Sequence, residues 1–185
     1  MNKKIEKMTQ IAIFSAIIVI LQLLATYINF GTFSITLTLI PIIIAGAVFG
    51  VGFGTLMGLV FGLTVTVIIL ISPDPSSALM LSTHPFITIS IVLLKGTLAG
   101  FVGALAYKLL SKKVKQPIAI TISAALAPIT NTLVFCLGLF LFFETGLKEL
   151  IGIVASTNFI VELLINVLLG SGLTGLITHW QNRNK

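Results

Sequence analysis

The sequence predicts an all-α integral membrane protein in which six transmembrane helices form a compact bundle. Hydrophobic residues make up 57% of the chain and charged residues 9%, and the mean hydropathy is +1.16. Soluble domains average about 45–50% apolar and about 25% charged residues, so this composition indicates a membrane protein. A transmembrane helix takes about 20 residues, so the 185-residue chain provides for about six helices with short connections. We therefore expect a single transmembrane domain over residues 1–185.

The basic residues predict the orientation of the bundle. The six expected spans are 8–28, 35–51, 54–72, 86–110, 117–143 and 157–180. Nine of the eleven basic residues lie at the same side of the membrane, either beside these spans or at the end of one: Lys3, Lys4, Lys7, Lys108, Lys112, Lys113, Lys115, Arg183 and Lys185. By the positive-inside rule, we expect both termini to be cytoplasmic. Attraction to anionic lipid headgroups then accounts for the net charge of +6, so no nucleic-acid partner is expected.

The first span carries two small residues, Ala12 and Ala16, four positions apart. Small residues at this spacing make a flat strip on which another membrane helix can pack. The connection that follows, residues 26–34, combines three aromatic residues with Asn29. Two interpretations of this connection are open. It forms either an aromatic belt at the membrane interface or a lid over an outward-facing pocket, to which Asn29 contributes.

Glycines recur at every fourth position of the second and third spans, at Gly46, Gly50, Gly54, Gly58 and Gly62. This period places them on nearly one face of a helix, where a second backbone can approach closely. Residues 50–54 contain three glycines and are typical of a tight turn, so we expect a glycine-lined helical hairpin over 41–62. The spacing alone leaves open whether this is a generic membrane packing motif or a family signature.

Prolines and further glycines also occur in the second span, in the fourth span and in the connection between the third and fourth spans. Pro41 is expected to kink the second span, because proline lacks a backbone donor. The fourth span has its own strip for close packing, which consists of Gly96, Gly100 and Gly103. Residues 73–85 contain three prolines and are expected to form a loop on the outer side.

Polar residues inside the last three spans predict a binding site. Lys95 lies about ten residues from the outer end of its span, or about 15 Å deep, where an ammonium group needs protein, water or a counter-ion around it. Asn131 lies in a polar patch of the fifth span, and Asn158, Glu162 and Asn166 form one stripe on the sixth. Under the predicted topology, Lys95, Asn131, Asn158 and Glu162 all lie in the outer half and can converge. Either Lys95 pairs permanently with Glu162, or it binds a ligand carboxylate while the other side chains bind hydroxyl and amide groups.

The sequence lacks the residues that are characteristic of several other classes of protein function. Cys136 is the only cysteine, so we expect no disulfide and no metal site, and we predict no cofactor. Residues 170–172, Gly-Ser-Gly, do not extend to the G-x-S-x-G motif of serine hydrolases, which makes a membrane enzyme the less favoured alternative. No G-x-x-x-x-G-K-[ST] loop is present, so energy from ATP would have to come through partner subunits. An autonomous small secondary transporter or channel stays open as the main alternative, although no pair of broken helices indicates an inverted repeat.

The chain resembles the substrate-binding (S) subunits of energy-coupling factor (ECF) vitamin transporters over essentially its whole length. The resemblance rests on six spans with both ends inside, on Ala12-x-x-x-Ala16, and on a signature in the second and third spans: Ile40-Pro41…Gly46…Phe49-Gly50…Gly54…Gly58…Phe61-Gly62. The turn after Gly50 lacks the proline that many members carry. The patch Thr130-Asn131-Thr132 is most similar to that of pantothenate-type members.

This resemblance implies a high-affinity vitamin-binding subunit in a prokaryotic plasma membrane. It implies that Ala12 and Ala16 dock on the transmembrane coupling subunit of the transporter. It also implies that the 26–34 connection closes over the bound vitamin, and that two ATPase subunits drive uptake.

Overall fold

A computed structural model gives the fold, and it describes residues 3–27, 29–30, 33–34, 37–172, 174–175 and 177. Within these ranges the side chains of residues 3, 27, 29, 30, 33, 34 and 158 are outside the description. The helices are α1 Lys3–Tyr27, α2 Leu39–Phe49, α3 Val51–Ile71, α4 Pro75–Thr83, α5 Pro85–Leu110, α6 Gln116–Phe142, α7 Leu147–Val154 and α8 Thr157–Gly172. Two short strands, β1 Asn29–Phe30 and β2 Phe33–Ser34, pair antiparallel after α1.

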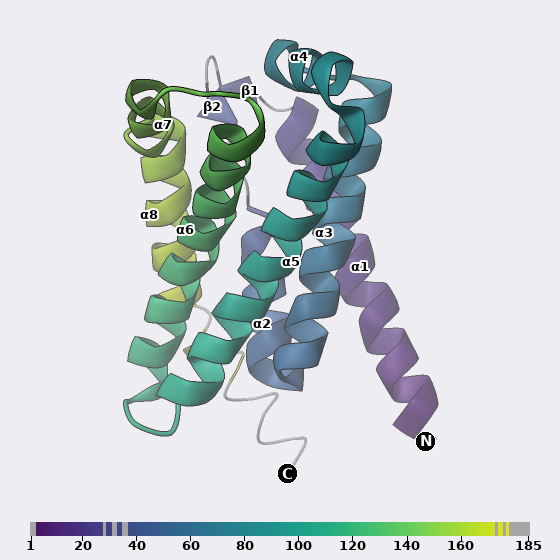
Figure 1. Cartoon of the computed structure of the whole chain (residues 1–185). Helices are drawn as coiled ribbons and strands as arrows, with labels where there is room; N and C mark the ends of the chain where they lie inside the picture. Colours follow the sequence, from purple (N-terminus) through teal and green to yellow (C-terminus); the bar gives the residue numbers. More distant parts are fainter. Residues whose placement is uncertain are drawn as a thin grey trace.

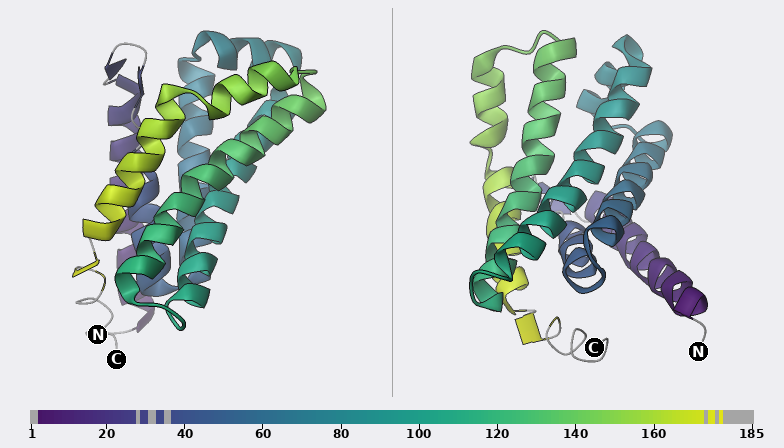
Figure 2. Two further views of the ribbon diagram at one scale, coloured as in Figure 1. Left: turned by 90° about the vertical axis from the view of Figure 1, so that its left-hand side faces the viewer. Right: turned by 60° about the horizontal axis from the view of Figure 1, so that its bottom comes forward.

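The long helices run side by side along one axis, with α4 and α7 at one end and the N-terminal end of α1 at the other (Figures 1 and 2). Where the chain is described, five stretches are long and apolar enough to cross a membrane: Lys4–Thr26, Val51–Ile71, Pro85–Leu110, Gln116–Phe142 and Leu147–Gly172. The last of them joins α7 and α8. The predicted all-helical membrane fold is therefore confirmed, whereas six spans of similar length are not found among the described residues.

The second predicted span, 35–51, is wrong in length. Among the described residues of this stretch, α2 covers Leu39–Phe49 and Val51 already belongs to α3, and the eleven residues of α2 extend about 16 Å at 1.5 Å per residue, which is short of a bilayer. The start of α2 is fixed by Thr38, which is fully buried and donates a hydrogen bond of 2.9 Å to the side-chain oxygen of Gln22 on α1. Pro41 then falls in the first turn of α2, where a backbone N–H would have no helical partner, so the kink predicted there is also wrong.

The predicted turn between α2 and α3 is confirmed at Gly50. This residue has φ 94° and ψ 175°, a conformation that is open essentially only to glycine. Its N–H donates to the carbonyl of Gly46 at 3.0 Å and so closes the end of α2. The chain re-enters a helix at the next residue, so α2 and α3 form the expected hairpin.

The glycine faces of α2 and α3 pack on α5. A Cβ placed on Gly58 would lie 2.3 Å from the carbonyl oxygen of Gly96, and one on Gly54 would lie 2.7 Å from the Cβ of Ala104. The backbones are in direct contact here, which explains why the four-residue period of glycine is needed. The strip on α5 continues from Gly96 through Gly100 to Ala104. Gly103, which was predicted to belong to this strip, also packs closely, but its nearest neighbour is Ala127 of α6, with Ile43 of α2 beside it.

Two helices were not predicted. Residues 73–85, expected as a loop, contain α4, whose N-cap Asp74 accepts hydrogen bonds from the backbone N–H groups of Ser76 and Ser77. Pro75 occupies the first position of this helix, which suits its fixed φ angle. The second, α7, follows Gly146, whose N–H donates to the Glu149 carboxylate at 3.2 Å.

Candidate functional site

Lys95 lies on α5, on the side that faces α6. Its Nζ atom is 4.8 Å from the centroid of the Phe135 ring, in cation–π geometry. The carboxylates that act electrostatically on this ammonium are those of Glu162 and Asp74. Partial burial raises the pKa of Asp74, but hydrogen bonds from Ser77 and Ser76 outweigh it, and its pKa lies below the ordinary carboxyl value. Asp74 therefore stays ionised at neutral pH and adds a negative charge at the end of the bundle that carries α4.

Within the part of the chain that the structure describes, three buried side-chain oxygens have no hydrogen-bond partner: Asn131 Oδ1, Glu162 Oε1 and Asn166 Oδ1. Asn131 comes from α6 and the other two from α8. Asn166 is fully buried, and its Nδ2 donates to the backbone carbonyl of Glu162 at 2.8 Å. Because a buried polar group without a partner costs about 1–3 kcal/mol, these atoms call for a donor that the described residues do not supply.

The packing of the helices fixes the level of each polar residue along the bundle axis. On the pair formed by α5 and α6, Ile91 packs against Gly138 and Gly103 against Ala127, so Lys95 lies near the level of Phe135. On the pair formed by α6 and α8, Gly170 packs against Ala124. Because both pairs run antiparallel, Glu162 lies near the level of Asn131, about one turn from Lys95 along the axis. Lys95, Asn131 and Glu162 are thus close in level on three neighbouring helices.

The remaining predicted binding residues fall outside the described side chains. Asn29 belongs to β1 and Asn158 to the first turn of α8, so only their backbones are placed. Asn166 was recognised in the polar stripe of the sixth span but was not assigned to the binding set. The signal that could have placed it there is its four-residue spacing from Glu162.

Lys95 and Glu162 do not form an ion pair in the described structure, although each lies in the other's electrostatic field. The ammonium instead lies over an aromatic ring, and the Glu162 carboxylate keeps one oxygen without a partner. Both groups are thereby available to a third molecule. This geometry favours the ligand-binding interpretation of Lys95 over the permanent pair.

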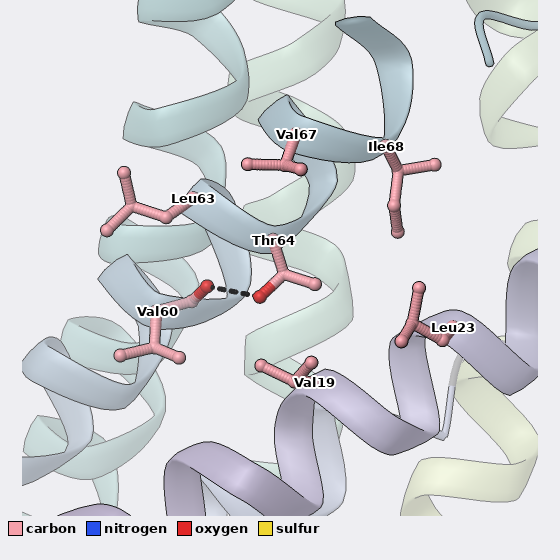
Figure 3. A pocket seen from close by; sticks show the side chains of 7 residues that line it. All are labelled: Val19, Leu23, Val60, Leu63, Thr64, Val67 and Ile68. Atoms are coloured by element: carbon pink, nitrogen blue, oxygen red, sulfur yellow. Dashed lines mark hydrogen bonds between the residues drawn. The ribbon is translucent and has the colours of Figure 1, made fainter. Parts of the chain in front are cut away.

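The predicted docking residues Ala12 and Ala16 are exposed on α1, whereas Ile18 of the same helix is fully buried against the bundle. Beyond them on the same face, Val19 and Leu23 line a groove between α1 and α3 (Figure 3). Among the described residues that line this groove, Thr64 is the one with a polar side chain, and its hydroxyl donates to the carbonyl of Val60 at 2.8 Å. The lining of this groove is therefore almost entirely apolar.

A second groove lies between α6 and α7. It is also apolar, and it is lined by Leu133, Cys136, Leu147, Leu150, Ile151, Val154 and Ala155. Polar ligand chemistry is consequently concentrated in the cluster on α5, α6 and α8. Among the residues described, no group of three or more His, Cys, Asp and Glu side chains is arranged to hold a metal ion.

Comparison with known proteins identifies the family of this chain. Residues 6–177 match the family model described as "ECF transporter, substrate-specific component". The chain is also 29% identical, over 198 residues and 99% of both sequences, to the "Pantothenic acid transporter PanT" of Lactococcus lactis subsp. cremoris (strain MG1363). The family and the apolar helices make this a multi-pass protein of the cell membrane. The chain belongs to the substrate-specific components of ECF transporters.

Proposed function

We propose that the protein is the vitamin-binding S component of an ECF-type importer and that its vitamin is pantothenate. It captures pantothenate from outside the cell and delivers it by associating with the transmembrane coupling subunit and two ATPase subunits. Family membership supports the S-component role, and similarity to a pantothenic acid transporter along the full length supports the choice of vitamin. Both comparisons are with transport proteins, which favours a transporter over a membrane enzyme.

The unpartnered oxygens of Asn131, Glu162 and Asn166 are the structural observation that supports pantothenate as the ligand. All three are hydrogen-bond acceptors, so they favour a molecule that brings donors. Pantothenate has three donors, namely two hydroxyl groups and one amide N–H. It also has one carboxylate, which suits the Lys95 ammonium through a charge-assisted hydrogen bond.

In this proposal Lys95 binds the carboxylate, while Asn131, Asn158 and Glu162 bind the amide and hydroxyl groups. Asn29 contributes from the connection after α1, which closes over the ligand. Ala12 and Ala16 form the docking strip for the coupling subunit, and their exposure on α1 supports this role.

Calorimetric titration of the purified protein tests the site. The two ligands are pantothenate and pantothenol, in which an alcohol replaces the carboxylate. We expect Lys95→Met to weaken pantothenate binding by about tenfold to over a hundredfold, since a hydrogen bond between charged groups contributes about 1.5–3 kcal/mol. Pantothenol affinity should change much less, and the control Lys108→Met, at an exposed position of the same helix, should leave both affinities unchanged. Absence of pantothenate binding by the wild-type protein would overturn the proposal.

A second measurement separates ligand binding from a structural ion pair. If Lys95 and Glu162 stabilise each other, Lys95→Met should lower thermal stability, and the double variant Lys95→Met, Glu162→Gln should recover both stability and binding. If Lys95 binds the ligand, the double variant should fold but bind pantothenate weakly. Wild-type affinity in the double variant would exclude the direct role of Lys95.

Reconstitution distinguishes the S component from an autonomous transporter. Proteoliposomes that contain only this chain should bind pantothenate without accumulating it, because the chain has no phosphate-binding loop of its own. Accumulation driven by an ion gradient in the absence of ATPase subunits would favour the autonomous transporter.

A further inference from the structure

Asn166 is a buried polar residue whose side chain is held in one orientation. Its Nδ2 donates to the carbonyl of Glu162 at 2.8 Å, which lies one turn earlier on α8. The reversed amide would place two acceptor oxygens against each other, so this bond decides which way the amide points. Oδ1 therefore faces away from the Glu162 carbonyl, and it is left without a donor at a position with 0% exposure.

The neighbouring surface of α6 does not supply that donor. Gly170 packs against Ala124, so by the antiparallel register Asn166, one turn away, lies at the level of Pro128. Proline has no backbone N–H, and Pro128 is itself fully buried inside α6. Asn166 thus lies at the level of an α6 residue that has no backbone N–H, and its Oδ1 atom has no hydrogen-bond partner among the described residues.

The axial distance from Lys95 to Asn166 matches the length of the proposed ligand. Lys95 lies at the level of Phe135 and Asn166 at that of Pro128. Seven residues of helix separate these levels, or about 10 Å at 1.5 Å per residue. The eight bonds from the carboxylate carbon of pantothenate to its terminal hydroxyl oxygen also extend to about 10 Å, at about 1.2 Å of reach per bond in an extended chain.

We infer that Asn166 is a specificity-determining residue which accepts the hydrogen bond of the terminal hydroxyl of pantothenate. The ligand then lies along the bundle axis, with its carboxylate at Lys95 and its hydroxyl end deeper, toward the level of Pro128. Asn131 and Glu162, at the intermediate level, accept from the amide N–H and the secondary hydroxyl. This inference rests on the proposed pantothenate site and adds to it the direction of the ligand and the residue that recognises its far end.

The orientation predicts how the protein discriminates between analogues. A ligand that lacks the terminal hydroxyl leaves the Asn166 oxygen buried and unpaired. Wild-type protein should therefore bind pantothenate roughly five- to a hundredfold more tightly than pantothenate without this hydroxyl. Because both ligands keep the carboxylate, Lys95→Met should weaken both by a similar factor.

Calorimetric titration of the Asn166→Leu variant tests the inference. The two ligands are pantothenate and pantothenate without the terminal hydroxyl, and the affinity for each is measured. Leucine has the same branched shape without polar atoms, so the two affinities should converge in this variant, while the exposed control Ser171→Ala should keep the wild-type preference. If Asn166→Leu does not fold, Asn166→Thr serves instead, since a threonine hydroxyl bonds to the carbonyl four residues earlier and replaces only the Nδ2 bond. A full wild-type preference in the folded variant would overturn the inference and would indicate that a buried water satisfies Asn166. Absence of binding of either ligand to wild-type protein would instead overturn the proposed function.

Discussion

The contact between α3 and α5 makes a sharp prediction for Gly58→Ala. A Cβ at this position would lie 2.3 Å from the carbonyl oxygen of Gly96 and 3.2 Å from the Cα of Gly100. Both atoms belong to the backbone of α5, so no side chain can rotate away to make room. The two helices would have to separate by about 1 Å to restore an ordinary contact, and a gap of about 0.5–1 Å already loses a quarter to a half of the dispersion energy of each atom pair.

The magnitude follows from two opposing contributions. Overpacking of this kind costs about 1–3 kcal/mol, whereas alanine is about 1 kcal/mol more favourable than glycine inside a helix. Gly52→Ala on the same helix provides the matched control, because a Cβ there would meet nothing within 4 Å. The difference between the two variants isolates the packing cost, so we expect Gly58→Ala to be less stable than Gly52→Ala by about 1–3 kcal/mol.

Thermal unfolding in detergent measures this difference. Cys136 is the only cysteine of the chain and its side chain is 7% exposed, so a thiol-reactive dye reports unfolding directly. At about 2–4 °C per kcal/mol for a chain of this size, the two melting temperatures should differ by about 2–12 °C. Equal melting temperatures for Gly58→Ala and Gly52→Ala would refute the close backbone contact between α3 and α5.

Three further predictions concern the turn, the topology and the docking strip. Gly50→Ala should destabilise the protein by about 1–3 kcal/mol in the same dye assay although the site has open space, because φ 94° strains any residue with a Cβ; an unchanged melting temperature would contradict this. In a Cys136→Ala background, Ser76→Cys should react with an impermeant thiol reagent from outside intact cells and Lys113→Cys only from inside, and the reverse pattern would invert the proposed orientation. The double variant Ala12→Trp, Ala16→Trp should abolish uptake yet keep pantothenate affinity, since bulky side chains block a close helix approach; normal uptake would exclude the docking role.

The sequence was most informative where one residue type satisfies a strict geometric need. The turn at Gly50 and the face formed by Gly54 and Gly58 could be predicted because only glycine fits them. The partner surface could not be predicted fully, since Ala104 rather than Gly103 continues the strip on α5. Alanine is frequent in any membrane helix, so spacing alone does not show which small residue faces which neighbour.

The two short helices were missed for a different reason. The capping signals were present in the sequence, as Asp74 followed by Pro75 and as Gly146 followed by Glu149. Frequent prolines and a polar composition favoured a loop for residues 73–85, and only the local hydrogen bonds of Asp74 decide for a helix. The length of α2 depended on tertiary contacts, because the buried Thr38 bonds to α1 and no local pattern specifies that partner.

The glycine contacts and the proposed binding residues meet on α5, where Gly96 and Lys95 are neighbours in the chain. Gly96 contacts α3 through its backbone, while Lys95, its neighbour in the chain, lies over Phe135 of α6. Successive residues of a helix are separated by about 100° around its axis, so a contact that fixes the rotation of α5 at Gly96 also fixes the direction of Lys95. A flexible lysine side chain on a loosely packed helix would lose much of its preference for one ligand position. The tight contact between α3 and α5 therefore does more than hold two helices together: by fixing the rotation of α5, it also fixes the direction in which Lys95 extends toward Phe135 of α6.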